Sequence, residues 1–220
     1  MENKGLNKVD LIFEKIDAKS TLEKAFAMTN DQIIQQVLES GLKGRGGAGF
    51  PTGLKWKYTA AEKDPEKYIV CNADEGEPGT FKDREILDKA AYKVYGGMAI
   101  AGRAMGAKKG YIYLRGEYSF LLPQLYMELY KFHKLISEIG YDFNIEYRMG
   151  SGAYICGEES ALFESIEGFR GEPRNKPPYP TTSGLFARPT SINNVETLVT
   201  AMMIIEKGAD HYVKLGTKDS

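Results

Sequence analysis

The stretch Lys67-Tyr-Ile-Val-Cys-Asn72, followed at once by Ala73-Asp-Glu-Gly-Glu-Pro-Gly79, decides the fold class. The first six residues are apolar and rich in β formers, and acids, glycines and proline end the run. This pattern predicts a buried strand that leads into a functional turn. The pattern recurs in Tyr111-Ile-Tyr-Leu114, which ends at Arg115-Gly116, and in Asn144-Ile-Glu-Tyr-Arg148, which ends at a glycine turn.

Helical patterns separate these predicted strands. One covers residues 91–105, and another covers 119–137, where Leu122, Leu125 and Leu129 recur at helical spacing. A strand, helix, strand, helix, strand order predicts a parallel sheet. We therefore expect an α/β fold, a parallel-sheet Rossmann-like sandwich.

Glycine and proline mark the remaining organisation. Helices are predicted at 30–40, 54–62, 157–166 and 194–206, and an atypical glycine-rich loop separates the first two. Between residues 168 and 189 prolines are too dense for a helix or an interior strand, which predicts a long, extended segment wrapped over the domain. The sequence thus divides into an N-terminal helical segment (1–40), an α/β domain (41–208) and a tail or the start of a further domain (209–220).

The composition of the chain excludes several classes of function. The 220 residues carry 29 Lys and Arg against 30 Asp and Glu, and a net charge of -1 provides no long-range field for nucleic acid or an anionic membrane. Cys71 and Cys156 are too few for a disulfide framework or a metal site, so no metal is expected. Without a signal-like start or an apolar run long enough to span a bilayer, the protein is predicted to be cytoplasmic, with no direct membrane insertion.

The loop Gly44-Arg-Gly-Gly-Ala-Gly49 satisfies G-x-G-x-x-G, but a helix precedes it where the dinucleotide fingerprint requires a strand. No Gly-Lys-Ser or Gly-Lys-Thr makes it a Walker A loop. Its backbone amides, the following helix N-terminus, and the cations Arg45 and Lys55 predict a phosphate site. The alternative is a mobile glycine loop without a ligand.

Polar turns follow two of the predicted strands. Asn72 and Asp74 lie where open α/β sheets bind ligands and could contact a ring edge or a ribose. A solvated acidic turn remains the alternative, whereas a calcium loop is disfavoured because EF-hand spacing is absent. Glu158 and Glu159 open a helix, where the macrodipole is sufficient to explain them, and they could equally bind ribose hydroxyls.

No catalytic side chain is expected. Cys156 is a candidate nucleophile only formally, because His133 and His211 are predicted on a helix and in the tail, away from the thiol.

Four motifs are specific enough to indicate a family. They are Gly44-Arg-Gly-Gly-Ala-Gly-Phe-Pro-Thr-Gly-Leu-Lys-Trp56, Cys71-Asn-Ala-Asp-Glu-Gly-Glu-Pro-Gly-Thr80, Gly152-Ala-Tyr-Ile-Cys-Gly-Glu-Glu159 and Asn193-Asn-Val-Glu-Thr197. Together they resemble the NADH-binding FMN flavoprotein subunit of respiratory complex I and the related subunits of NAD-linked, electron-bifurcating hydrogenases and formate dehydrogenases. The resemblance extends over roughly residues 41–220.

The resemblance implies bound FMN with NADH laid over its ring. At matching positions, the FMN contacts would be Arg45, Gly46, Gly47, Ala48, Lys55, Asn72, Asp74, Glu75, Tyr154, Gly157, Glu158, Asn193, Asn194 and Thr197. The NADH contacts would be Phe50, Glu77, Glu159 and Lys176, together with Tyr58 and Tyr179, where relatives often have phenylalanine.

By resemblance, the chain is an oxidoreductase module, an FMN-dependent NADH dehydrogenase. It would accept a hydride from NADH onto FMN and pass single electrons to an iron–sulfur partner, or run in reverse. The cofactor supplies the chemistry, and the protein supplies orientation and electrostatics.

Relatives continue into a ubiquitin-like domain and a four-cysteine [4Fe–4S] domain, which two cysteines cannot supply. The cluster is therefore expected in a missing C-terminal region or in a partner subunit of a hetero-oligomeric complex. The alternative is a non-catalytic nucleotide-binding assembly module, or an inactive fragment without the cluster domain.

Overall fold

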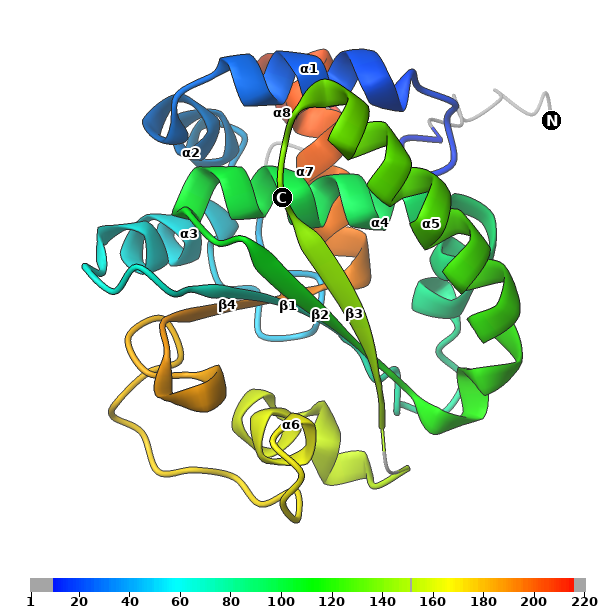
Figure 1. Cartoon of the computed structure of the whole chain (residues 1–220), viewed down its shortest axis with the longest axis vertical. Helices are drawn as coiled ribbons and strands as arrows, with labels where there is room; N and C mark the ends of the chain where they lie inside the picture. Colours follow the sequence, from blue (N-terminus) through cyan, green and yellow to red (C-terminus); the bar gives the residue numbers. More distant parts are fainter. Residues whose placement is uncertain (1–9, 151, 216–220) are drawn as a thin grey trace, which may run out of the picture.

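The computed structural model describes residues 10–150 and 152–215, and it is organised around one four-stranded sheet (Figure 1). The strands are β1 (Tyr68–Ala73), β2 (Lys109–Leu114), β3 (Asn144–Met149) and β4 (Thr190–Asn194). They pair in parallel in the order β3-β2-β1-β4. The predicted α/β fold with a parallel sheet is confirmed.

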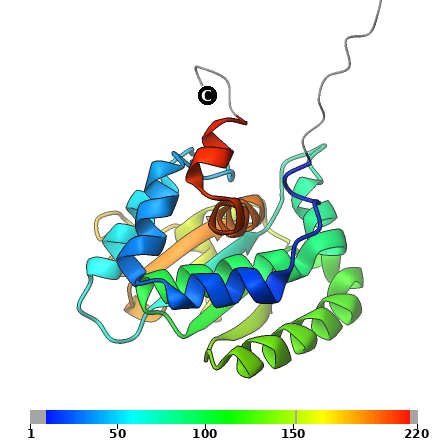
Figure 2. The same ribbon diagram turned by 90° about the horizontal axis from the view of Figure 1, so that it is seen from above.

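Helices cover both faces of this sheet (Figure 1). One face carries α1 (Ala18–Ala27), α2 (Asn30–Glu39), α3 (Thr52–Ala61), α4 (Lys82–Met105), α5 (Leu122–Ile139), α7 (Val195–Lys207) and α8 (Ala209–Val213). The opposite face carries α6 (Glu159–Ile166) and the proline-rich segment, and short 3-10 turns lie at Gly116–Leu121, Tyr154–Gly157 and Leu185–Ala187. Figure 2 shows α1, α4 and α5 side by side above the strands.

The alternation of side chains along β1 explains the two layers. Ile69 and Cys71 belong to the large core under the helices, whereas Tyr68 and Val70 belong to a smaller cluster with Phe163 of α6. Successive strand residues point to opposite faces, so an uninterrupted apolar run is what a strand covered on both sides requires.

Helices α4 and α7 are packed with their backbones in close contact. A Cβ atom placed on Gly97 would lie 2.1 Å from the carbonyl oxygen of Leu198, and one on Gly96 would lie 2.5 Å from Sδ of Met202. Only glycine permits this approach. The contact joins the part of α4 beyond Ala90 to α7, the helix that follows β4.

Three elements differ from the sequence prediction. Helix α4 has a break in its helical geometry at Ala90, and the predicted helix at 91–105 is the part after that break. The part before it begins at Lys82, where the carboxylate of Glu75 accepts hydrogen bonds from two amides of the first turn. Strand β4 was not predicted, since Thr190-Ser-Ile-Asn-Asn194 is short and mostly polar. The predicted tail contains α8 and continues into residues 216–220, which lie outside the described residues.

The N-terminal helices share the main core. Leu22 of α1 and Ile33 of α2 are fully buried in the same cluster as α4 and α7. The boundary at residue 40 stays a prediction. Within the described ranges, no helix is both long and apolar enough to cross a bilayer, and no group of three or more His, Cys, Asp or Glu side chains could hold a metal.

The strand order creates a topological switch point. From β1 the chain builds outward through β2 to β3, and then returns on the other side of β1 as β4. Open α/β sheets bind ligands in the crevice outside the carboxyl ends of strands at such a point. Here that crevice lies beyond Ala73 and Asn194.

Candidate flavin nucleotide site

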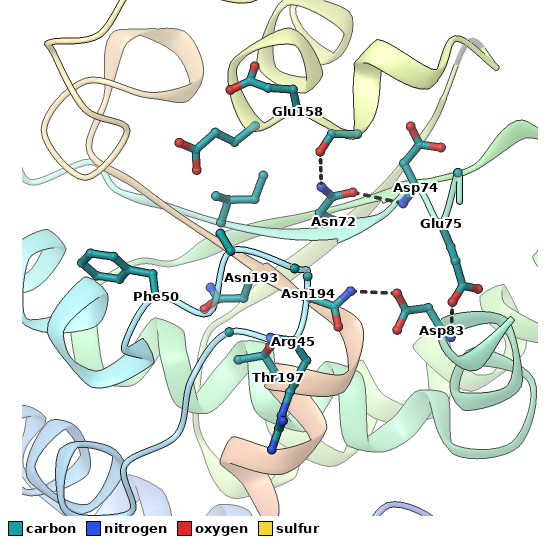
Figure 3. Close-up of a pocket in the computed structure, with 18 of the residues that line it drawn as sticks. Arg45, Phe50, Asn72, Asp74, Glu75, Asp83, Glu158, Asn193, Asn194 and Thr197 are labelled. Atoms are coloured by element: carbon teal, nitrogen blue, oxygen red, sulfur yellow. Dashed lines mark hydrogen bonds between the residues drawn. The ribbon is translucent and has the colours of Figure 1, made fainter. Parts of the chain in front are cut away.

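A cavity of about 740 Å³ opens at this switch point (Figure 3). Its lining includes every binding residue predicted from the sequence except Tyr58 and Tyr179. It also includes residues that were not predicted: Gly44, Gly49, Thr52, Gly76, Thr80, Lys82, Asp83, Ile155 and Ile192. The motifs separated along the chain therefore meet in one place.

The glycine-rich loop on one wall is anchored at its ends. Lys43 and Pro51 form an antiparallel bridge, and the amide of Gly44 donates to the carbonyl of Phe50 over 2.9 Å. The amide of Arg45 donates to Oγ1 of Thr197 on α7, also over 2.9 Å. These contacts fix the entry and exit of the loop, which argues against the mobile-loop alternative.

The middle of the loop presents backbone donors. The amides of residues 46–50 make no well-formed hydrogen bond to any acceptor in the described part of the chain. Gly47 and Gly49 have φ of +115° and +65°, which glycine adopts without strain. Successive amides of a turn that lack strong internal partners can form an anion-binding concavity, so the loop fits the phosphoryl group of FMN.

The two cations predicted to bind phosphate, Lys55 and Arg45, direct their side chains to different places. Lys55 lines the cavity, and its Nζ donates to the carbonyl of Ile192 over 2.9 Å. Burial lowers the pKa of Lys55. The guanidinium of Arg45 instead donates to the hydroxyl of Tyr212 over 3.0 Å and lies 3.9 Å from Glu196, so its side chain runs along α7 (Figure 3).

Arg45 thus lines the cavity, but its guanidinium is paired with Tyr212 and Glu196, so its role in phosphate binding stays a prediction. A cation that the sequence reasoning missed, Lys82, lines the cavity and lies 3.2 Å from a carboxylate oxygen of Glu196. It also donates to Asp83 and to Oδ1 of Asn194, over 2.6 and 3.0 Å. Lys82 begins a helix after an acidic turn, and no sequence motif includes it that would have predicted its place at the cavity.

Asn72 and Asp74 are ordered by the protein. Nδ2 of Asn72 donates to the carbonyl of Gly157 over 2.9 Å, and its Oδ1 accepts from the amide of Asp74 over 3.1 Å (Figure 3). Burial raises the pKa of Asp74, although the charge of Arg115 opposes the shift. These bonds order the first residues of the turn, whereas residues 77–80 are exposed to solvent.

Glu75 has a structural explanation. Its carboxylate accepts from the amides of Asp83 and Arg84 over 3.1 and 3.3 Å, and from the hydroxyl of Tyr118 over 3.1 Å. The side chain therefore caps the N-terminus of α4, where a negative charge is favourable. These partners account for its burial without a ligand, although it also lines the cavity.

A hydrogen-bonded pair joins the end of β4 to the first turn of α4. Nδ2 of Asn194 donates to Asp83 over 2.7 Å, and its Oδ1 accepts from the amide of Glu196 at the start of α7 (Figure 3). Burial raises the pKa of Asp83, whereas the charge of Lys82 acts in the opposite direction. Neighbouring Asn193 is fixed by Trp56, whose Nε1 donates to Oδ1 over 3.1 Å.

Acidic side chains at the start of α6 line another wall of the cavity. Glu158 caps α6 by accepting from the amides of Ser160 and Ala161, which confirms the helix-opening explanation for it. Lys176 of the proline-rich segment pairs with Glu158 over 3.0 Å and also contacts Glu159.

Aromatic rings lie at the cavity and elsewhere on the surface. Phe50 and Tyr154 line the cavity and remain 45% and 68% exposed, so their rings are available to a planar ligand. Tyr58 and Tyr179 are also exposed, but the structure does not bring them to the cavity lining.

The histidines and cysteines do not form a catalytic pair. Nε2 of His133 accepts from the amide of Ile145 over 3.3 Å, and His211 lies on α8; neither lines the cavity. Cys71 and Cys156 are both buried.

Comparison with known proteins places this site in a family. Residues 37–202 match the family described as the Nuo51 FMN-binding domain, and the chain belongs to that family. The fold is therefore that of an FMN-binding domain. The resemblance read from the four motifs is confirmed.

Individual relatives agree with this assignment. The chain is 48% identical over 213 residues to the NAD-reducing hydrogenase HoxS subunit alpha of Cupriavidus necator, covering 94% of this chain and 35% of that protein. It is 48% identical over 195 residues to the mitochondrial NADH dehydrogenase [ubiquinone] flavoprotein 1 of Dictyostelium discoideum, covering 84% and 40%. A crystal structure of an NAD⁺-reducing [NiFe]-hydrogenase in the H₂-reduced state matches with a TM-score of 0.89 at 47% identity, covering 94% of this chain and 36% of that chain. The chain thus spans between a third and a half of the length of these relatives.

Proposed function

We propose that this chain binds FMN in the switch-point cavity and acts as an NADH-oxidising module that passes electrons to an iron–sulfur partner, or works in reverse. The observation that carries this proposal is the glycine-rich loop, whose amides at residues 46–50 make no well-formed hydrogen bond within the described residues and which lines one cavity together with Lys55, Asn72 and Asp74. The names of the relatives support the choice of a nicotinamide nucleotide.

When bound, FMN supplies the capacity to take up a hydride and to release electrons singly. The residues of this chain bind the two nucleotides and orient them. Loop amides hold the phosphoryl group, while Asn72, fixed by Gly157, presents a prealigned amide to the ribityl chain or ring. The exposed ring of Phe50 stacks against the second nucleotide, and the Lys176 ammonium faces its charged groups.

No side chain is required to transfer a proton in this scheme. Hydride transfer depends on holding two rings in a near-attack arrangement, so the protein contributes position rather than acid–base chemistry. The iron–sulfur acceptor is placed outside the described residues, which hold no suitable group of cysteines. Such an acceptor would belong to another chain or to a further domain.

The test is an anaerobic spectroscopic titration of the purified protein after incubation with FMN. We expect the absorption of bound oxidised flavin, and we expect NADH to bleach it within the time in which free FMN stays oxidised. Dithionite serves as the positive control for reduction. Retention of the FMN without bleaching by NADH contradicts the oxidoreductase activity, and failure to retain FMN favours the non-catalytic alternative.

A further inference from the structure

Thr52, the first residue of α3, carries a polar group that the structure leaves without a partner. Its side chain is only 2% exposed and lines the cavity. Its amide donates to the carbonyl of Leu42 over 2.9 Å, but its Oγ1 makes no hydrogen bond within the described residues. A buried hydroxyl without a partner is costly, and most such groups in native proteins are satisfied.

The other buried threonine of this helix shows what is missing. Thr59 is fully buried, and its Oγ1 donates to the carbonyl of Lys55, four residues earlier, over 3.1 Å. A threonine inside a helix can satisfy its hydroxyl in this way. Thr52 begins the helix, and Ala48 four residues earlier belongs to the glycine-rich loop. The cavity is therefore the place where its hydroxyl can find an acceptor.

The surroundings indicate the chemistry of that acceptor. Lys55 lies one turn further along the same helix and also lines the cavity, and the unpaired amides of residues 46–50 precede Thr52 directly. All of these groups are donors. A ligand that satisfies them presents acceptor oxygens, such as the charged oxygens of a phosphoryl group or the neutral hydroxyl oxygens of a polyol.

We propose that Thr52 is a ligand-binding residue that donates its hydroxyl to an oxygen of the bound flavin nucleotide. This inference rests on the proposed function and adds a specific contact to it. The hydroxyl acts on the ligand and not on the fold.

The variants Thr52→Val and Thr59→Val separate these two roles, because valine matches the shape of threonine without its hydroxyl. For Thr52→Val we expect a dissociation constant for FMN about three- to tenfold higher, from the loss of one hydrogen bond. We expect the FMN-free protein to be as stable to urea as the wild type, or more stable. Thr59→Val should bind FMN as the wild type does and lose stability, because a satisfied hydrogen bond is removed. Thr52→Ser, which keeps the hydroxyl, should restore FMN binding.

Fluorescence quenching of free FMN and of riboflavin gives the affinities without reliance on activity. A loss with FMN alone assigns the acceptor to the phosphoryl group, and an equal loss with both assigns it to the ribityl chain or ring; both results support the contact. Wild-type affinity in Thr52→Val, or a loss that Thr52→Ser does not restore, overturns it while leaving the proposed function intact. If the wild type itself binds neither flavin, the proposed function fails as well.

Discussion

Lys55 shows how a single side chain combines position and charge. Its half-buried side chain donates to the carbonyl of Ile192, and desolvation lowers its pKa although the charge of Glu159 acts against the shift. The folded protein therefore disfavours the protonated form, and a bound phosphoryl or other anionic oxygen would restore it. Lys55 is better explained by a ligand than by the stability of the empty fold.

Replacing this lysine should weaken FMN binding. Because a hydrogen bond to a charged group contributes about 1.5–3 kcal/mol, Lys55→Met is expected to raise the dissociation constant for FMN by one to two orders of magnitude. Lys57→Met, an exposed position on the same helix, is the matched control and should leave it unchanged. Both constants can be measured by fluorescence quenching.

The same residue predicts a pH dependence. Lys55 holds an anion only while protonated, and its pKa is lowered, so FMN affinity should fall as pH rises through that lowered pKa. In Lys55→Met this part of the dependence should disappear. An identical pH profile for wild type and variant would show that Lys55 does not contact the ligand.

At the scale of single residues, the sequence predicted cavity residues where they belong to a recognisable motif. The glycines of the loop were predicted as a phosphate site from their residue types, Asn72 from a strand-to-turn pattern, and Asn194 from the family resemblance. All of them line the cavity. Thr52 and Asp83 were not predicted, since their role depends on whether a partner is present in three dimensions. The orientation of Arg45 also follows from a distant residue, Tyr212, which no local pattern indicates.

At the level of elements, the contact between α4 and α7 determines how the cavity is framed. Both helices begin at the cavity edge, with Asp83 in the first turn of one and Asn194 capping the other. The hydrogen bond between Asn194 and Asp83 links those two starts, and the helices approach closely further along, at Gly97 and Leu198. Sequence patterns predicted the second half of α4 and the whole of α7, but not this contact.

Gly97→Ala tests the helix contact. Alanine favours a helix over glycine by about 1 kcal/mol, but here its Cβ would lie 2.1 Å from the carbonyl oxygen of Leu198. Overpacking of this kind costs about 1–3 kcal/mol or more, so a net loss of stability is expected in urea unfolding. Lys89→Ala, at an exposed position on the same helix, should change stability little. A more stable Gly97→Ala protein would refute the close contact.

Strand β4 illustrates what local patterns miss. It is a polar edge strand that pairs with β1 and with no other strand of the described sheet, and it follows the proline-rich segment. Its place is set by long-range pairing and by the core beneath α7, not by the β propensity of its residues. Yet this strand creates the switch point, because it lies on the opposite side of β1 from β2.

For the whole molecule, one sheet brings four distant motifs to one crevice. The motifs lie after β1, before α3, before α6 and at the end of β4, and the parallel pairing places the strand ends at the same edge. The sequence order of strands and helices was enough to predict that edge. The positions and hydrogen bonds of the side chains in the cavity could be obtained only from the structure.

The most direct test of the central claim is an electron-density map of the protein crystallised with FMN. The account predicts the flavin in the cavity of about 740 Å³, with its phosphoryl oxygens within hydrogen-bond distance of the amides of residues 46–50. Density for FMN at any other position, with this loop left without a ligand, would contradict it.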